Sequence, residues 1–156
     1  YLTEHCSAPI FIDPVSTVKA EKLRGLLRRV HTLKPNRIEA ELLSGVKITD
    51  DESLYRAAQA LIDQGVGRVF LSLGEGGVLA VQPGEVQRVP ICKAEMRNAT
   101  GAGDAMMASL VWSFLAGRTL AQSAAAGTAA AAIAVESEET INPAMSAEAV
   151  ESRLAH

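Results

Sequence analysis

Short apolar runs alternate with longer segments of helical periodicity along this chain. Residues 10–13 (Ile-Phe-Ile-Asp) form an apolar run that Pro14 ends, and apolar side chains then recur at helical spacing through residues 17–30. Residues 31–34 repeat the short run before Pro35. Because strands joined through helices pair in parallel, the pattern predicts an α/β fold. We expect a three-layer α/β/α, Rossmann-like arrangement with a mainly parallel sheet covered on both faces.

The rest of the sequence continues the alternation and ends in helices rich in alanine. Further strands are predicted at residues 68–73, 77–82 and 85–90, and further helices at residues 36–43, 54–64, 105–116, 120–135 and after Pro143. No internal repeat and no linker-like segment interrupts this order, so no domain boundary is predicted within residues 1–156.

Composition and charge exclude several classes of protein. With 48% hydrophobic but only 4% aromatic residues, the chain suits helices packed on a sheet better than an all-β sandwich. The formal net charge is −3, and no basic stripe that could neutralise the phosphates of a nucleic acid is found in the sequence. Cys6 and Cys92 form no metal or redox motif, and the apolar stretch 105–116 is too short to span a bilayer. A cytoplasmic protein with neither a membrane nor a nucleic-acid partner is therefore expected.

The sequence begins with Tyr1 and not with an initiator Met, so we expect it to be a piece of a longer protein.

A glycine-rich segment, residues 98–104, leads into the apolar helix predicted at residues 105–116. Glycines at a helix start let the backbone approach a ligand, and the free N–H groups there bind anions such as phosphate. Asp104 falls in the first helical turn, where the helix dipole favours negative charge and a carboxylate can accept a hydroxyl proton. An aspartate that merely favours a helix N-terminus explains the residue equally well, so these arguments leave both interpretations open.

The run at residues 100–105 (Thr-Gly-Ala-Gly-Asp-Ala) resembles the C-terminal signature of the ribokinase-like (PfkB-type) carbohydrate kinases. Three further runs fall in that family's order, at residues 34–39 (Lys-Pro-Asn-Arg-Ile-Glu), 72–77 (Ser-Leu-Gly-Glu-Gly-Gly) and 127–130 (Gly-Thr-Ala-Ala). The resemblance implies that residues 1–156 are the C-terminal, ATP-binding and catalytic part of a ribokinase-like domain, without its N-terminal substrate and lid part.

The resemblance also implies a role for each residue of the glycine-rich run. Asp104 would be the general base, and the amides of Gly101, Ala102 and Gly103 would stabilise charge on the transferring phosphoryl group. Thr100 would contact the nucleotide.

Asn36 and Glu39 have two good interpretations. Asn at a helix start with Glu three residues later is a capping box, which accounts for the pair structurally. In the family that it resembles, an Asn-x-x-Glu at this place helps to hold Mg²⁺ and the ATP phosphates. A single Glu is chemically sufficient because Mg²⁺ keeps several waters. The two roles do not exclude each other.

The remaining nucleotide contacts are implied by the resemblance alone. Ser72 and Gly74 would lie near the phosphates and ribose, Gly77 would allow close approach, and Lys34 would add a point charge. Thr128 would lie near the adenine. A glycine turn between strands, a solvated lysine and close helix packing around Thr128 are the structural alternatives.

Three longer sequence segments narrow the choice of substrate within the family. Residues 11–16, 31–37 and 98–108 are most similar to pseudouridine kinases, which implies phosphorylation of the pseudouridine 5′-hydroxyl by ATP. Ribose, fructose or a nucleoside such as inosine are the alternatives within the family, and a non-catalytic nucleotide-binding module is the alternative outside it. Asn98 stands where many relatives carry an Asp near a monovalent cation, so the sequence does not decide whether this chain binds such a cation. A homodimer through regions outside this chain also stays open. The isolated residues 1–156 are expected to have little activity.

Overall fold

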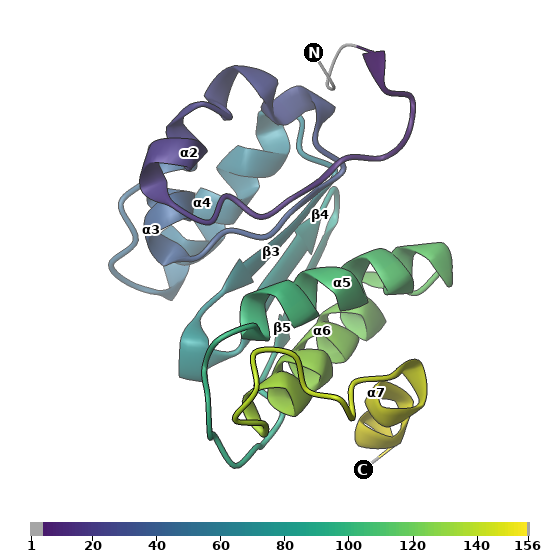
Figure 1. Ribbon diagram of the computed structural model, residues 1–156. Helices are drawn as coiled ribbons and strands as arrows, with labels where there is room; N and C mark the ends of the chain where they lie inside the picture. Colours follow the sequence, from purple (N-terminus) through teal and green to yellow (C-terminus); the bar gives the residue numbers. More distant parts are fainter. Residues whose placement is uncertain (1–4, 156) are drawn as a thin grey trace. The chain divides into compact units, whose positions relative to one another are not determined.

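The computed structural model describes residues 5–155, and these residues form two compact units (Figure 1). The first unit comprises residues 5–73 and 79–87, and the second comprises residues 74–78 and 88–155. Strands alternate with helices in the first unit, whereas the second is mainly helical.

A five-stranded sheet with the order β1-β2-β3-β4-β5 runs through the described residues. Its strands are β1 (Phe11–Ile12), β2 (Thr32–Leu33), β3 (Arg68–Ser72), β4 (Val78–Gln82) and β5 (Glu85–Val89). β1, β2 and β3 are parallel, with Ile12 opposite Leu33 and Leu33 opposite Val69. β4 and β5 follow through connections too short for a parallel crossover, so they run antiparallel to their neighbours. The predicted α/β class, with parallel strands joined through helices, is confirmed.

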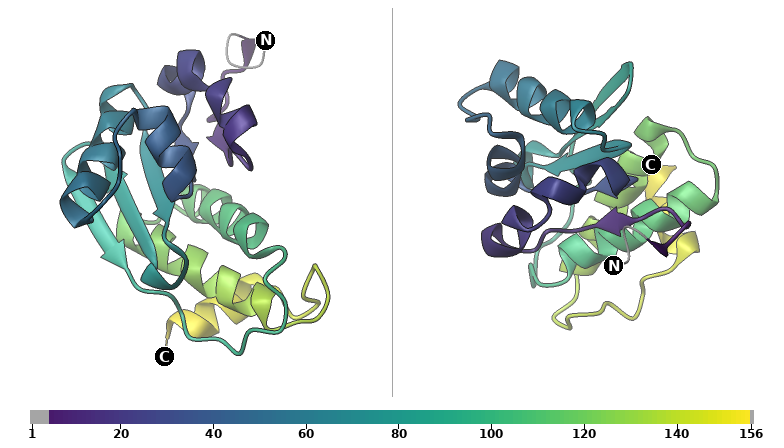
Figure 2. Two further views of the ribbon diagram at one scale, coloured as in Figure 1. Left: turned by 90° about the vertical axis from the view of Figure 1, so that its left-hand side faces the viewer. Right: turned by 90° about the horizontal axis from the view of Figure 1, so that it is seen from above.

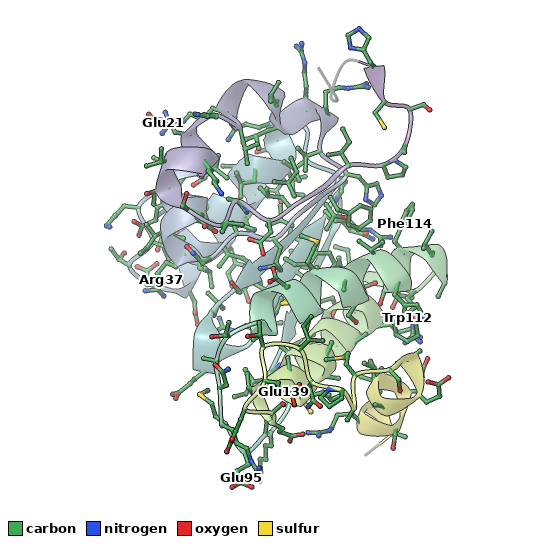
Figure 3. The ribbon with its side chains drawn as sticks, viewed as in Figure 1. Glu21, Arg37, Glu95, Trp112, Phe114 and Glu139 are labelled. Atoms are coloured by element: carbon green, nitrogen blue, oxygen red, sulfur yellow. The ribbon has the colours of Figure 1, made fainter. Side chains whose placement is uncertain are left out.

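The helices of the first unit are α2 (Thr17–Glu21), the 3₁₀ helix η1 (Arg24–Arg29), α3 (Arg37–Ser44) and α4 (Asp51–Asp63). α3 and α4 pack against β3 and bury an aliphatic core that includes Leu33, Leu61 and Val69. Gly45 ends α3 in the left-handed conformation, with φ of 73°. Arg37, at the start of α3, lies on the surface of this unit (Figure 3).

The prediction of a single helix at residues 17–30 is wrong, because the structure has two shorter helices there. The α-helix is broken after Glu21, where the amides of Lys22 and Leu23 donate to carbonyls three residues earlier, at 3.2 and 2.9 Å. This 3₁₀ bonding continues into η1, which contains Gly25, a poor residue for an α-helix. The apolar spacing predicted a helical path but could not reveal the tighter winding.

A strained turn follows β1. Ser16 N donates to Pro14 O at 2.7 Å, which makes Val15 the central residue of a three-residue γ-turn. Val15 has a φ of +64°, a region that β-branched residues rarely adopt, and its side chain is 66% exposed. No burial of the side chain compensates for this strain, so the turn is held by the segments around it.

The second unit is built from α5 (Ala102–Leu115), α6 (Leu120–Val135) and α7 (Ala147–Leu154), as predicted from the alanine-rich sequence. α5 and α6 lie side by side (Figure 2), so closely that a Cβ on Gly127 would be 3.1 Å from Cγ of Met106. Trp112 of α5 (Figure 3) stacks under the guanidinium of Arg118, which also pairs with Glu151 of α7. Within residues 5–155, no helix has the length and apolar character needed to cross a membrane.

Val15→Gly is expected to stabilise the protein, because glycine adopts positive φ freely and little buried surface is lost. We expect a gain of about 1 kcal/mol in the free energy of unfolding, measured by urea denaturation. Val18→Gly is the matched control: Val18 is similarly exposed, at 72%, but lies within α2. That change should cost about 0.5 kcal/mol. A loss of stability in Val15→Gly would show that the turn is not strained.

Candidate functional site

The carboxyl ends of the three parallel strands meet at one edge of the first unit, where open α/β sheets usually bind ligands. Asp13 follows β1, Lys34 follows β2 and Ser72 ends β3. Ser72 N donates to Pro35 O at 2.9 Å, and its hydroxyl donates to the same oxygen at 3.3 Å. Asn36 and Ser72 form an isolated parallel bridge. Lys34, Asn36 and Ser72 of the sequence prediction are therefore brought together.

The capping box predicted at the start of α3 is confirmed. Asn36 Oδ1 accepts from Glu39 N, and Glu39 Oε2 accepts from Asn36 N, both at 2.9 Å. Glu39 is only 3% exposed, and its other carboxylate oxygen has no hydrogen-bond partner among residues 5–155. One carboxylate oxygen that remains available suits Mg²⁺, which takes few protein ligands and completes its shell with water and phosphate. The residues thus fit the predicted metal role, which stays a prediction. Groups of three or more His, Cys, Asp or Glu side chains able to hold a metal are absent from the described part of the chain.

Lys34 is a buried cation with unused donors. Its side chain is 7% exposed, and its Nζ contacts Asp13 Oδ2 at 2.7 Å. An ammonium group has three N–H donors, and within the described residues no second partner is found. Buried donors are normally satisfied, so the group is suited to an anionic ligand with several oxygens, such as a phosphate chain.

The predicted glycine-rich site lies at the start of α5 in the second unit. Gly101 is the N-cap residue, and no side chain caps this helix start. Ala102, Gly103 and Asp104 form the first turn, in which the amides have no acceptor within the helix. Asp104 is exposed, and the Thr100 amide donates to Asn98 Oδ1 at 2.9 Å. The start of α5 therefore offers amide donors to an anion, with a carboxylate in the same turn.

A glycine is required at Gly101 on two grounds. Its φ is +87°, and a Cβ would lie 2.5 Å from Thr140 O. The residue thus joins the start of α5 closely to the loop before α7. Asn98 holds the same region, because its Nδ2 donates to Glu138 O at 3.1 Å. The monovalent cation near this region stays a prediction.

The other predicted nucleotide contacts are explained in part by packing. A Cβ on Gly77, whose φ is +82°, would be 2.1 Å from Val89 O, whereas nothing lies within 4 Å of a Cβ on Gly74. Glycine is therefore required at Gly77 by its positive φ and by the close approach of Val89, whereas Gly74 has open space beside it. The hydroxyl of buried Thr128 donates to Ala125 O at 2.9 Å within α6, which favours a packing role. Nucleotide contacts at these three residues stay predictions.

Asp13 is the residue that the sequence analysis missed. The sequence pattern gave Asp13 no role of its own beyond its place at the end of a predicted strand, whereas the structure pairs it with Lys34. An acidic residue at the end of one strand and a lysine at the end of the next could have suggested the pair, because parallel neighbours end at the same edge.

Comparison with known proteins identifies the family. A sequence model described as pfkB family carbohydrate kinase matches residues 2–147. The chain belongs to the pfkB family of carbohydrate kinases. The family resemblance inferred from the four motifs is thereby confirmed, and so is the ribokinase-like fold.

Individual relatives of this pfkB chain are known in sequence and structure. The pseudouridine kinase of Escherichia coli (strain K12) is 38% identical over 146 residues, which are 93% of this chain and 47% of that protein. A candidate sugar kinase from Clostridium perfringens has a TM-score of 0.94 at 30% identity, covering 99% of this chain and 50% of the other. The ribokinase of Arabidopsis thaliana, solved with ribose and ATP, has a TM-score of 0.78 at 25% identity, covering 85% and 43%. This chain spans about half the length of these relatives.

Gly101→Ala is expected to destabilise the second unit. Gly117→Ala is the matched control, since Gly117 lies just beyond the other end of α5 with a φ of +67° and open space around its Cβ. The control should cost about 1 kcal/mol from backbone strain, and Gly101→Ala about 2–3 kcal/mol because a clash is added. Urea denaturation of both variants measures the difference, and equal losses would show that the contact with Thr140 does not constrain Gly101.

Proposed function

We propose that the full-length protein transfers the γ-phosphoryl group of ATP to a hydroxyl of a sugar or nucleoside, with Asp104 as the general base. The observation that carries the proposal is the helix start at Gly101, where uncapped amides and the Asp104 carboxylate occur in one turn. Membership of the pfkB family supports this assignment over an aspartate that only stabilises a helix end. Residues 1–156 would be the C-terminal, ATP-binding part of the kinase.

Each residue of this helix start has a chemical task. Asp104 would accept the hydroxyl proton as the substrate oxygen bonds to the γ-phosphorus and ADP leaves. The amides of Gly101, Ala102 and Gly103 would donate to the phosphoryl oxygens as charge develops on them. Backbone donors suit this task because the fold already holds them in place, so little reorganisation is needed during the reaction.

The polar edge of the first unit would serve the nucleotide. Lys34 would donate to phosphate oxygens, and Ser72 would lie near them. The available oxygen of Glu39, with Asn36 beside it, would bind Mg²⁺ directly or through water. When bound, Mg²⁺ would supply charge neutralisation on the phosphates. Thr100, Gly74, Gly77 and Thr128 complete the proposed nucleotide contacts.

Pseudouridine is the substrate that we propose, with its 5′-hydroxyl as the acceptor. The support is the identity of 38% to the Escherichia coli pseudouridine kinase together with the motif phrases at residues 11–16 and 98–108. Ribose, fructose and inosine are the competing acceptors, since ribokinases also occur among the relatives. The rest of the full-length protein would present the hydroxyl, so residues 1–156 alone are expected to turn over poorly.

The full-length protein is expected to phosphorylate pseudouridine faster than ribose, fructose or inosine in a coupled ADP-release assay.

Asp104→Asn tests the general-base role of Asp104. It should reduce kcat by about a thousandfold or more while the Kd for ATP changes by less than about threefold, because the amide keeps the shape but cannot accept the proton. An unchanged rate in Asp104→Asn would refute the general base, and failure with pseudouridine but turnover of another acceptor would refute the substrate alone. ATP binding without any transfer would favour a non-catalytic module.

Glu39→Gln separates the metal role from the capping role. Glutamine still accepts a hydrogen bond from Asn36 N, so the free energy of unfolding should change by less than about 0.5 kcal/mol. The Mg²⁺ concentration for half-maximal activity should rise by about tenfold, because the neutral amide is a weaker ligand. Glu39→Ala should lose both functions, with a stability cost of about 1 kcal/mol. Unchanged Mg²⁺ dependence in Glu39→Gln would leave Glu39 as a cap only.

A further inference from the structure

We propose that Asp13 is a positioning residue that holds the Lys34 ammonium group at the carboxyl edge of the sheet, so that its two remaining N–H donors bind the phosphates of the nucleotide. This inference rests on the proposed function, because it assigns a partner to the lysine of that site. Asp13 itself does not touch the nucleotide; it acts through Lys34.

Burial gives the ion pair between Lys34 and Asp13 a fixed geometry. The side chains of Lys34 and Asp13 are 7% and 21% exposed, and their charged atoms are 2.7 Å apart. A buried ammonium group needs a partner, because removing it from water without one is strongly unfavourable. The backbones are also fixed, since Lys34 N donates to Ile12 O at 3.0 Å between neighbouring strands. The pair therefore has a defined geometry, which flexible surface pairs lack.

Both carboxylate oxygens of Asp13 are occupied. Oδ2 contacts Lys34, and Oδ1 accepts from Val15 N at 3.4 Å. Val15 is the strained centre of the γ-turn, so the chain keeps an unfavourable backbone conformation beside Asp13. Strain of this kind persists where the surrounding structure imposes it, and it is concentrated at functional sites. With a contact on each oxygen, Asp13 is suited to anchoring a neighbour.

Lys34 in turn keeps donors for a ligand. Glu39 offers carboxylate oxygens, which only accept hydrogen bonds, and the Ser72 hydroxyl already donates to Pro35 O. Within residues 5–155 the ammonium contacts Asp13 alone. An anion with several oxygens can accept from two donors on one nitrogen, and hydrogen bonds to charged oxygens are the stronger ones. The phosphate chain of a nucleotide is the ligand class that fits.

Asp13→Asn in the full-length protein tests the inference through the affinities for ATP and adenosine, measured by calorimetry. Asparagine keeps the shape but cannot hold the ammonium as firmly, so ATP binding should weaken by about tenfold while adenosine binding is unchanged. Lys34→Met should weaken ATP binding at least as much, and the double variant should be no worse than Lys34→Met alone. Glu41→Gln is the matched control, because Glu41 and Lys47 also pair at 2.7 Å but Lys47 is 78% exposed. That control should leave both affinities unchanged.

Two results would overturn the inference. Unchanged or tighter ATP binding in Asp13→Asn would show that the carboxylate does not position Lys34. Equal losses for ATP and adenosine, with a lower unfolding midpoint, would show that the pair only stabilises the fold. If Asp13→Asn does not fold, Asp13→Glu provides the test: it keeps the charge but displaces it, so we expect weaker ATP binding with unchanged adenosine binding. Loss of phosphoryl transfer in Asp104→Asn, together with unaltered ATP binding in Asp13→Asn, would refute this inference and leave the proposed function intact.

Discussion

The parallel pairing of β1, β2 and β3 is the interaction on which the polar edge of the first unit depends. Parallel neighbours run in one direction, so the residues that follow them, Asp13 after β1 and Lys34 after β2, are placed side by side. An antiparallel arrangement would send these residues to opposite edges. The short strands carry few hydrogen bonds, and the core beneath α3 and α4 therefore secures the arrangement. The chemistry at this edge follows from strand direction before any single side chain is considered.

Features that depend on neighbouring residues could be predicted from the sequence. The capping box at Asn36 and the full length of α6 were both predicted, because caps and helical periodicity are encoded within a few residues. The helix start at Gly101 was predicted for the same reason. The requirement for glycine there was predicted only in general terms, since the close approach of Thr140 comes from a distant part of the chain.

Three features of the structure could not be predicted from the sequence pattern. The break between α2 and η1 leaves the apolar spacing unchanged and alters only the winding of the backbone. The pairing of Asp13 with Lys34 joins residues that follow two different strands, and a lysine at a strand end is usually solvated. Val15 illustrates the same limit, because nothing local predicts a β-branched residue at positive φ.

Residues that stabilise the fold and residues proposed to bind the nucleotide overlap at this edge, and the overlap is physically consistent. Glu39 uses one carboxylate oxygen to cap α3 and keeps the other, so its capping role does not compete with a cation. Lys34 likewise uses one donor for Asp13 and keeps two. Groups already held by the fold lose little conformational entropy when a ligand binds, because their rotamers are fixed beforehand. The structural bonds of Glu39 and Lys34 thus prepare their remaining atoms for a ligand.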